Sequence, residues 1–431
     1  MTHGTLSFLC LEKYMKNNFF KWLVLLAVGL VAGANGGNTL AFAPILGDVA
    51  HDLGIGIPLA QGSFLGIFLF VVAISIVVGG ILADRLGVTK TMIIASLAGI
   101  IPNLLFPILG HIFGAVVVLR IFQGFGAGCV FALIPLVAAH WFAPEEKGRV
   151  VGMGMTMLNA GMMVGIVGAP MVYQKVGNWR STMMWMGLVE ILILLFALYI
   201  SANYKKNEPV HTTAAHGQEA SGWQTMKSAL HNPTTYIGII MCIFISWLLN
   251  ALNDLTPQYF ALNAPIGVGF GRMKAGQLML AVQVGTILGG LIGGFVLDKI
   301  FKGNPKPVLL LGFLVTAVSV YSILFPSVYN SFLLIPILGL AGVTVAFLNP
   351  AAAVFVAQTY PEKIVGKVVG IWLGIGAFGG GMGIISSAIC LHATGTYVLT
   401  IRLFAAVAIL GLILSQVLNR DVKLSLTAER N

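Results

Sequence analysis

Residues 79–90 read GGILADRLGVTK and lie between two long apolar runs. The stretch combines a glycine pair, the acid Asp84, two bases and a turn glycine. A similar phrase, GGFVLDK, recurs at residues 293–299, and in both copies the acid follows the glycine pair at the same spacing and directly precedes a base. Because the copies lie roughly half the chain apart, the sequence predicts two related halves, an arrangement that is typical of transporter folds.

The composition places the chain in a membrane. Of its 431 residues, 58% are hydrophobic and 9% are charged, and the mean hydropathy is +0.95. This sequence contains too few polar residues to cover the surface of a soluble domain of the same length. Apolar runs of about 20 residues, each long enough to cross a bilayer as a helix, fill most of the sequence. We therefore predict an all-α polytopic membrane protein.

A second pair of phrases repeats in the same order as the first. Residues 144–152 read PEEKGRVVG and residues 361–370 read PEKIVGKVVG, and each phrase opens an apolar run. About six spans separate the two copies, so both halves begin on the same side of the membrane. The sequence therefore predicts parallel repeats, related by an axis along the membrane normal.

The net charge of +10 does not indicate a nucleic-acid partner, because the bases lie mostly in short loops, where they act as topology signals. The cysteines are scattered without metal-ligand spacing and are expected to pack in the core. The first apolar run is longer than a signal peptide, so we expect it to remain as the first span.

We predict about 12 spans, which form two six-helix bundles. The approximate spans are 20–46, 59–83, 90–110, 112–140, 149–173, 181–203, 234–261, 273–298, 306–326, 330–357, 365–390 and 396–418. The longest polar interval divides them equally. The predicted domains are therefore an N-terminal bundle over residues 1–203, a cytoplasmic linker over 204–232 and a C-terminal bundle over 233–431.

The distribution of basic residues predicts the orientation. If the N-terminus lies inside, the inner loops carry most of the bases and the outer loops carry few, as the positive-inside rule requires. The outer loops then hold only Lys175, Arg180, Arg272 and Lys274. Both termini are expected in the cytoplasm of a bacterial cell, with the protein in its cytoplasmic (inner) membrane.

These motifs together resemble those of the major facilitator superfamily. The 79–90 loop is similar to the superfamily's best-known signature, with residues 293–299 as a weaker copy. Arg120-Ile-Phe-Gln123-Gly resembles its Arg-x-x-Gln-Gly phrase, and Asn178-Trp-Arg before the sixth span also fits. The resemblance implies two bundles that rock around a central site and open it alternately to each side.

The paired charges of the repeated loops are candidate gating residues. Asp84 and Arg85 would pair with the neighbouring bundle in one state and lose that pairing in the other, and Asp298 and Lys299 are their second-half counterparts. The alternative is a topology anchor that holds the second span in place.

Four ionisable residues lie within apolar runs, where they are expensive and should face a cavity or a partner. One of them, Arg402 in the outer part of the twelfth span, could instead reach outward to the membrane surface. Arg120 in the fourth span could hold a carboxylate with two hydrogen bonds, or could instead bind backbone carbonyls of neighbouring helices. Asp254 lies late in the seventh span, where Pro257 should break or kink the helix. Asp254 is a candidate proton carrier; the alternative is that it lies at a helix end that is exposed to water. Glu190 is a second candidate proton carrier, although the resemblance implies a position for the sixth span outside the cavity.

Polar residues of the spans that are expected to line the centre complete the candidate substrate site. With Arg120, the set comprises Asn35, Asn38, Gln123, Asn159, Asn250, Asn253, Gln283, Asn349 and Trp372. A lone tryptophan in a span is more often packing than a cavity wall.

We expect a proton-coupled secondary transporter of a small organic anion of the carboxylate type, working as a monomer in the lipid bilayer. No metal cluster, catalytic triad or phosphate-binding loop is present in the sequence, so we expect no enzyme activity, no cofactor, and a proton or sodium gradient as the driving force. The alternatives are a proton-driven exporter of drugs or siderophore-like compounds, a carrier of amino acids or nucleosides, and a transport-inactive sensor. Pro170 is displaced from its place in the antiport signature, which argues against the exporter.

Overall fold

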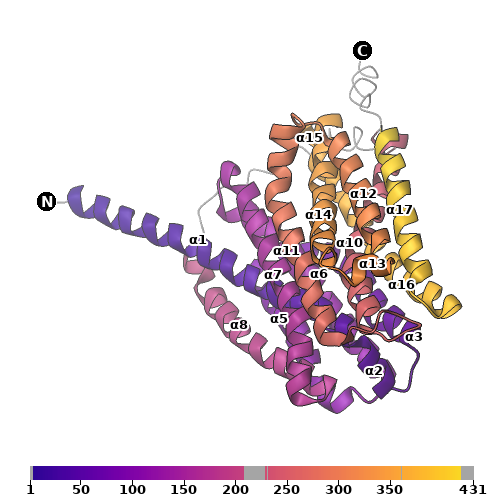
Figure 1. The fold of residues 1–431 in the computed structure, drawn as a ribbon. Helices are drawn as coiled ribbons and strands as arrows, with labels where there is room; N and C mark the ends of the chain where they lie inside the picture. Colours follow the sequence, from indigo (N-terminus) through magenta and orange to yellow (C-terminus); the bar gives the residue numbers. More distant parts are fainter. Residues whose placement is uncertain (1–2, 208–228, 231, 361, 419–431) are drawn as a thin grey trace.

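The computed structural model describes residues 3–207, 229–230, 232–360 and 362–418, and these residues form helices without a β-strand. Within them, 12 helices are long and apolar enough to cross a membrane, which confirms the predicted spans. The helices of the second half run side by side, whereas α1 projects away from the rest at its N-terminal part (Figure 1). Most of the predicted linker, residues 208–228, lies outside the described residues, so the domain boundaries stay a prediction.

The first half contains six spans. The spanning helices are α1 (His3–Leu40), α4 (Ile67–Leu86), α5 (Val88–Leu109), α6 (Phe113–Trp141), α7 (Pro144–Val176) and α8 (Trp179–Asn207). The short helices η1 (Ala43–Ile45), α2 (Leu46–Asp52) and α3 (Ile57–Ala60) and the π-helical turn η2 (Gln61–Gly66) connect α1 to α4.

The second half contains the other six. Its spanning helices are α10 (Pro233–Ala261), α11 (Gly271–Phe295), α12 (Pro305–Ser322), α14 (Leu334–Thr359), the pair α15 (Glu362–Gly376) and α16 (Phe378–Thr394), and α17 (Val398–Val417). A π-helical turn, η3 (Val296–Ile300), extends α11, and the short helix α13 (Pro326–Tyr329) precedes α14. The eleventh span was predicted as one helix, but it consists of two that meet at Ala377.

The loop quoted at the outset turns at Gly87, between α4 and α5. Gly87 has φ of +87°, a conformation that side chains with a Cβ rarely adopt, and a Cβ there would meet no neighbouring atom. The backbone angle alone therefore favours glycine at this position. Gly79 of the same motif is explained by packing instead, because a Cβ there would collide with the Cys129 backbone on α6.

Glycine also fixes the distance between α1 and α7. A Cβ on Gly161 would collide with the carbonyl group of Gly33, and a Cβ on Gly165 would collide with that of Gly37. The two helices thus pack backbone against backbone, as small residues allow in membranes. This contact holds Asn35 and Asn38 of α1 in the middle of the first half.

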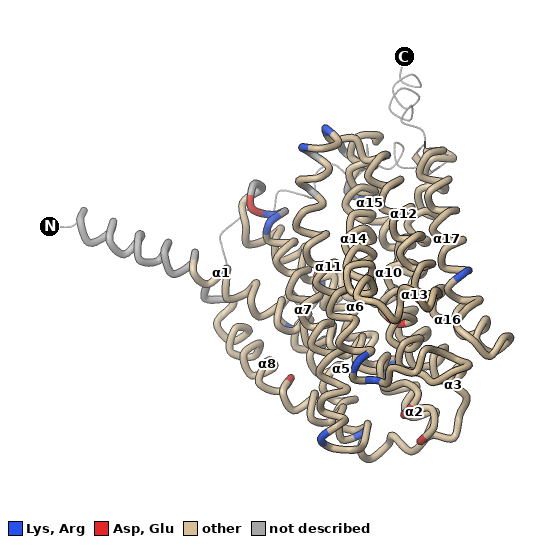
Figure 2. The backbone as a smooth tube through the Cα atoms, viewed as in Figure 1, with Lys and Arg blue, Asp and Glu red and all other residues tan. Residues whose placement is uncertain are grey.

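The two ends of the bundle are distinguished by chain connections and charge. We call the end where α8 finishes and α10 begins the linker end, and the end that carries Asp48 and Arg272 the latch end. Figure 2 shows that charged residues gather mainly at these two ends and that few lie at mid-depth. The few at mid-depth define the candidate site.

Candidate functional site

Arg120 on α6 is completely buried, and its guanidinium is held by the first half alone. Its Nε donates to the carbonyl oxygen of Phe64 (2.8 Å), and its Nη1 donates to the Asn38 carbonyl oxygen (2.9 Å) and to Gln123 Oε1 (2.8 Å). The rings of Phe42 and Phe68 lie 4.6 and 4.1 Å from its central carbon. An arginine has five N–H groups. Three are used here, and the two on Nη2 have no hydrogen-bond partner.

A chain of amides connects Arg120 to Glu190. Gln123 Nε2 donates to Asn103 Oδ1 (2.8 Å), and Asn103 Nδ2 donates to Asn38 Oδ1 (2.8 Å) and to Glu190 Oε1 (3.2 Å). The network crosses α1, α5, α6 and α8, which all belong to the first half. Asn103 was missed by the sequence analysis; its signal was a polar amide within the otherwise apolar third span.

The second half contributes a buried carboxyl group. Asp254 on α10 is 2% exposed, which rules out the alternative of a wet helix end, and its Oδ1 has no hydrogen-bond partner. Beside it, Asn253 Oδ1 accepts a hydrogen bond from Gln283 Nε2 (2.6 Å) of α11. A break or kink was expected at Pro257, and the break is wrong, because α10 runs on to Ala261. In the same turn, Gln258 Nε2 donates to the Asp254 carbonyl oxygen (2.9 Å).

The two halves bring Arg120 and Asp254 toward each other at mid-depth. Their charges interact electrostatically across the boundary between the halves, yet the two side chains form no direct ion pair. Each keeps an unpaired polar atom, Nη2 on one and Oδ1 on the other. Unpaired buried groups of opposite charge are expensive, so their arrangement suits a polar guest that satisfies both.

At the latch end the halves are tied by a polar cluster, the latch, which consists of Gln61, Gln258, Ser387 and Tyr397. Gln61 Nε2 donates to Ser387 Oγ (2.9 Å), and Tyr397 Oη lies 3.0 Å from Gln61 Oε1 and 2.5 Å from Gln258 Oε1. The tyrosine has one proton and donates to one of these oxygens at a time. The sequence analysis did not identify any of the four residues.

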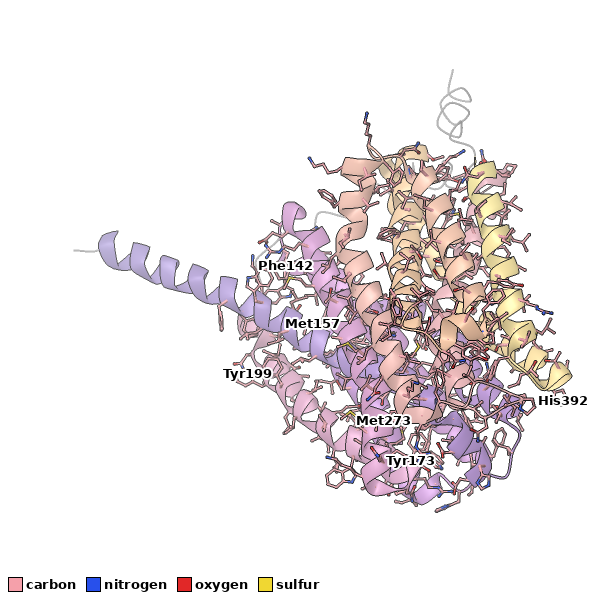
Figure 3. The ribbon with its side chains drawn as sticks, viewed as in Figure 1. Phe142, Met157, Tyr173, Tyr199, Met273 and His392 are labelled. Carbon is pink, nitrogen blue, oxygen red and sulfur yellow. The ribbon has the colours of Figure 1, made fainter. Side chains whose placement is uncertain are left out.

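An ion pair reinforces the same end of the interface. The Arg272 guanidinium on α11 pairs with Asp48 of α2 and lies over the ring of Tyr173 on α7, 4.1 Å from the ring centroid. Figure 3 labels Tyr173 and the neighbouring Met273 in this region. Nearer mid-depth, the rings of Phe70 and Phe378 lie 6.1 Å apart across the two halves. The latch end is therefore closed by polar and aromatic contacts.

The linker end differs. Asp84 and Arg85 are exposed there, and Lys299 is also exposed, while the Asp298 side chain lies outside the described residues. Among the described side chains, the ion pairs that involve the first half's linker end stay within that half, as in Lys21–Glu146. The charged loop after α4 thus has no ionic partner among the second-half side chains that the structure describes.

Residues 25–304 and 260–426 match the family model of the Major Facilitator Superfamily. The chain belongs to this superfamily. It is 24% identical over 369 residues to the sialic acid transporter NanX of Escherichia coli, a match that covers 80% of each chain. It is also 21% identical over 187 residues to the uncharacterized protein Cj0987c of Campylobacter jejuni, of which it spans 56%.

The fold is also similar to that of a solved structure. The proton:xylose symporter XylE, solved with 6-bromo-6-deoxy-D-glucose, superposes with a TM-score of 0.65 at 16% identity, over 92% of this chain and 95% of that one. At that identity the likeness concerns the fold alone. The chain is therefore a multi-pass secondary transporter of the Major Facilitator Superfamily, a family of transporters rather than enzymes.

The remaining predicted site residues of this superfamily member differ from one another in burial and in hydrogen bonding. Asn35 is buried and donates to the Val31 carbonyl oxygen, while Asn250 is half-buried and donates to that of Ser246. Asn159 and Asn349 are half-buried.

Trp372 lies apart from the Arg120–Asp254 centre. It is 1% exposed within the second half's core, between Phe355 and Tyr360, whose rings lie 6.2 and 6.3 Å from its own. A Cβ on Gly238 of α10 would collide with its indole. These contacts correspond to the packing alternative rather than to a cavity wall.

Proposed function

We propose that this transporter carries a small organic anion with a carboxylate group, and that protons drive its uptake. The observation that carries the proposal is the pair of unpaired atoms at the centre, Arg120 Nη2 and Asp254 Oδ1, which come from opposite halves. A carboxylate oxygen would accept from Nη2 in a charge-assisted hydrogen bond, the stronger kind. NanX, whose name gives an acid as its cargo, supports this substrate class.

The geometry limits how Arg120 can hold the anion. Since Nε and Nη1 are committed to Phe64, Asn38 and Gln123, the guanidinium cannot present its usual two-nitrogen fork. The carboxylate would bind through Nη2 alone, and Asp254 Oδ1 would accept from a hydroxyl or ammonium group elsewhere on the substrate. The favoured cargo is therefore a carboxylate with a hydrogen-bond donor, such as a hydroxy acid or a sugar acid.

Charge balance supplies the reason for proton coupling. Without substrate, the charges of Arg120 and Asp254 cancel. A monocarboxylate adds one negative charge to a low-dielectric centre, and one proton on Asp254 restores neutrality, which lowers the free energy of reorienting the loaded carrier. We therefore assign proton coupling to Asp254, at one proton for each monocarboxylate. Glu190 is the alternative carrier, but it lies at the peripheral end of the amide chain.

The orientation completes the proposal. The charge bias puts the latch end outside and both termini in the cytoplasm of a bacterial cell, so the structure would represent a state closed to the outside. In the opposite state, Asp84 and Arg85 would pair with the second half near Asp298 and Lys299. The protein would work as a monomer in the inner membrane, on an ion gradient and without a cofactor or a nucleic-acid partner.

Transport by proteoliposomes tests the proposal. Binding is first screened by thermal shift against hydroxy acids, sugar acids, amino acids, nucleosides and drugs. For the best ligand, Asp254→Asn should abolish accumulation driven by a proton gradient but keep exchange of labelled for unlabelled substrate, because the amide cannot titrate.

Arg120→Gln tests the role of the buried arginine. Its matched control is Arg402→Gln, which changes an exposed arginine on α17. The control should bind the ligand normally, and Arg120→Gln should not bind it. The organic-anion proposal fails if the ligands found are neutral or cationic. It also fails if a correctly folded Arg120→Gln protein binds the anion as tightly as the wild type.

A further inference from the structure

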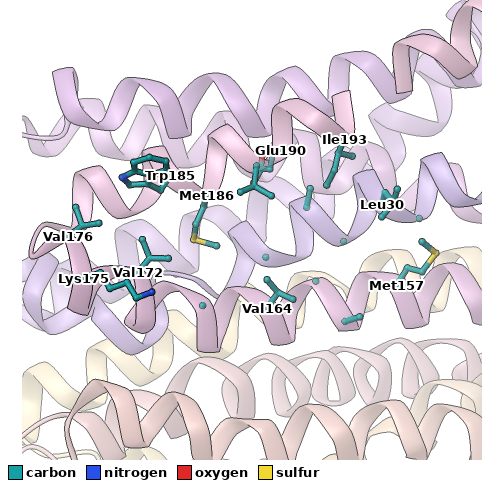
Figure 4. Close-up of a pocket in the computed structure, with 18 residues that line it drawn as sticks. Leu30, Met157, Val164, Val172, Lys175, Val176, Trp185, Met186, Glu190 and Ile193 are labelled. Atoms are coloured by element: carbon teal, nitrogen blue, oxygen red, sulfur yellow. The ribbon is translucent and has the colours of Figure 1, made fainter. Parts of the chain in front are cut away.

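A slot lies on the periphery of the first half, away from the centre. Its volume is about 660 Å³, and α1, α7 and α8 form its walls. Figure 4 shows Leu30 of α1, Met157 and Val164 of α7, and Met186 and Ile193 of α8 around it. The lining is almost entirely apolar, with Glu190 at mid-length and Lys175 near one end.

The slot faces the surroundings of the protein rather than its second half. Val164 and Val189, on opposite walls, are 63% and 62% exposed, and Trp185 is 51% exposed. The main neighbours of α8 are α1, α5 and α7, all in the first half. In a chain with 12 spanning helices, exposed apolar residues at this depth are in contact with lipid chains.

The dimensions of the slot match the bilayer. Its lining on α7 runs from Met157 to Val176, a length of about 28 Å at the helical rise per residue. The hydrocarbon core of a bilayer is about 30 Å thick, so one leaflet accounts for about 15 Å, and a lipid chain that starts at the Lys175 end reaches the middle of the slot, where Glu190 lies. Lys175 is exposed in the last turn of α7, where a cation would be level with lipid headgroups.

We propose that the slot binds one glycerophospholipid, with an acyl chain along α7 and α8 and the phosphate beside Lys175. The apolar walls match the chain, and the single cation at the end of the slot matches the phosphate. A free substrate is a poorer match, because the lining offers few polar groups to orient one. The proposal does not depend on the cargo of the transporter.

A bound chain would also affect the amide network. Glu190 lines the slot and accepts a hydrogen bond from Asn103, which connects through Gln123 to Arg120. An acyl chain against Glu190 would exclude water from the peripheral end of this network. The lipid would thereby separate the interior hydrogen bonds from the bilayer surface.

Native mass spectrometry of delipidated protein, titrated with phosphatidylglycerol, tests the proposal. Val164→Trp fills the slot from its exposed side and should abolish retention of the first lipid. Val318→Trp is the matched control, because Val318 is 62% exposed on α12, outside the slot, and it should retain lipid like the wild type. Lys175→Gln should weaken retention about fivefold, since a lysine near the headgroups contributes roughly that much.

Quenching by phosphatidylglycerol with brominated chains locates the lipid. Trp185 lines the slot, so the wild type should lose a fluorescence component that is absent from Trp185→Phe. The proposal is overturned if Val164→Trp retains lipid as well as Val318→Trp does. It is also overturned if the brominated lipid quenches the wild type and Trp185→Phe to the same extent.

Discussion

The substitution Tyr397→Phe tests the latch directly. Tyr397 is completely buried. The substitution removes only the hydroxyl group, so the packing of the ring stays as it is. The hydroxyl donates a hydrogen bond either to Gln61 of the first half or to Gln258 of the second. When the latch end opens, Gln61 moves away from Tyr397 with its own half. The substitution should therefore shift the conformational equilibrium toward the state in which the latch end is open.

The magnitude follows from the number of bonds lost. Since the hydroxyl has one proton, one hydrogen bond disappears, and such bonds in membrane proteins contribute about 0.6 kcal/mol on average and at most about 1.7 kcal/mol. The population ratio of the two states should then change by roughly 3-fold, with an upper limit near 18-fold. Gln61 keeps its bond to Ser387, so a value toward the lower end is expected.

Distances between spin labels measure this ratio. His51 and Asn330 are exposed residues at the latch end, one in each half, and cysteines there can carry the labels. The matched control is Tyr321→Phe, which removes the hydroxyl of a 40% exposed tyrosine on α12. If Tyr397→Phe and Tyr321→Phe give the same distance distribution, the latch does not stabilise the closed state and the reasoning is refuted.

Two further substitutions test contacts within the first half. Asn103→Leu removes three hydrogen bonds and should lower the free energy of unfolding by about 2 kcal/mol, and by at most about 5 kcal/mol, in reversible detergent unfolding. The control Asn349→Leu, at a half-buried asparagine, should have a smaller effect. Equal losses in the two variants would contradict the network. Gly161→Ala should lower the same free energy by about 1–3 kcal/mol, because the added Cβ collides with the Gly33 backbone. Gly152→Ala, on the same helix with open space around it, should be neutral, and a neutral Gly161→Ala would argue against close packing of α1 on α7.

The sequence predicted the architecture well, since span number depends on the length of apolar runs and a membrane makes that signal strong. Gly87 could be interpreted from the sequence because its role is local. Burial of Arg120, Gln123, Asn253 and Gln283 could be expected because polar side chains inside spans are expensive in contact with lipid.

Contacts between distant residues could not be predicted. Gln61 and Tyr397 are 336 positions apart, and neither belongs to a motif. The helix α10 continues through Pro257 to Ala261, although a proline in a helix interior usually breaks or kinks it, and the sequence pattern does not indicate this outcome. Trp372 is of a residue type that could form a cavity wall, but it packs in the core. Its ring lies against Phe355, and its indole occupies the space beside Gly238.

The distribution of polar contacts suits a protein that changes state. The bonds of Arg120 and the whole amide chain to Glu190 lie within the first half, so they can move as one body without breaking. The polar contacts between the halves that the structure describes are few and individually weak: the pair of Asp48 and Arg272 is partly exposed and contributes about 0–1 kcal/mol, and the latch bonds contribute about 0.6 kcal/mol each. A ligand needs about 5.5 kcal/mol of differential affinity to reverse a 1:99 equilibrium. These polar contacts together fall below that value, so breaking them does not by itself prevent a ligand that binds Arg120 and Asp254, as proposed above, from selecting the opposite state.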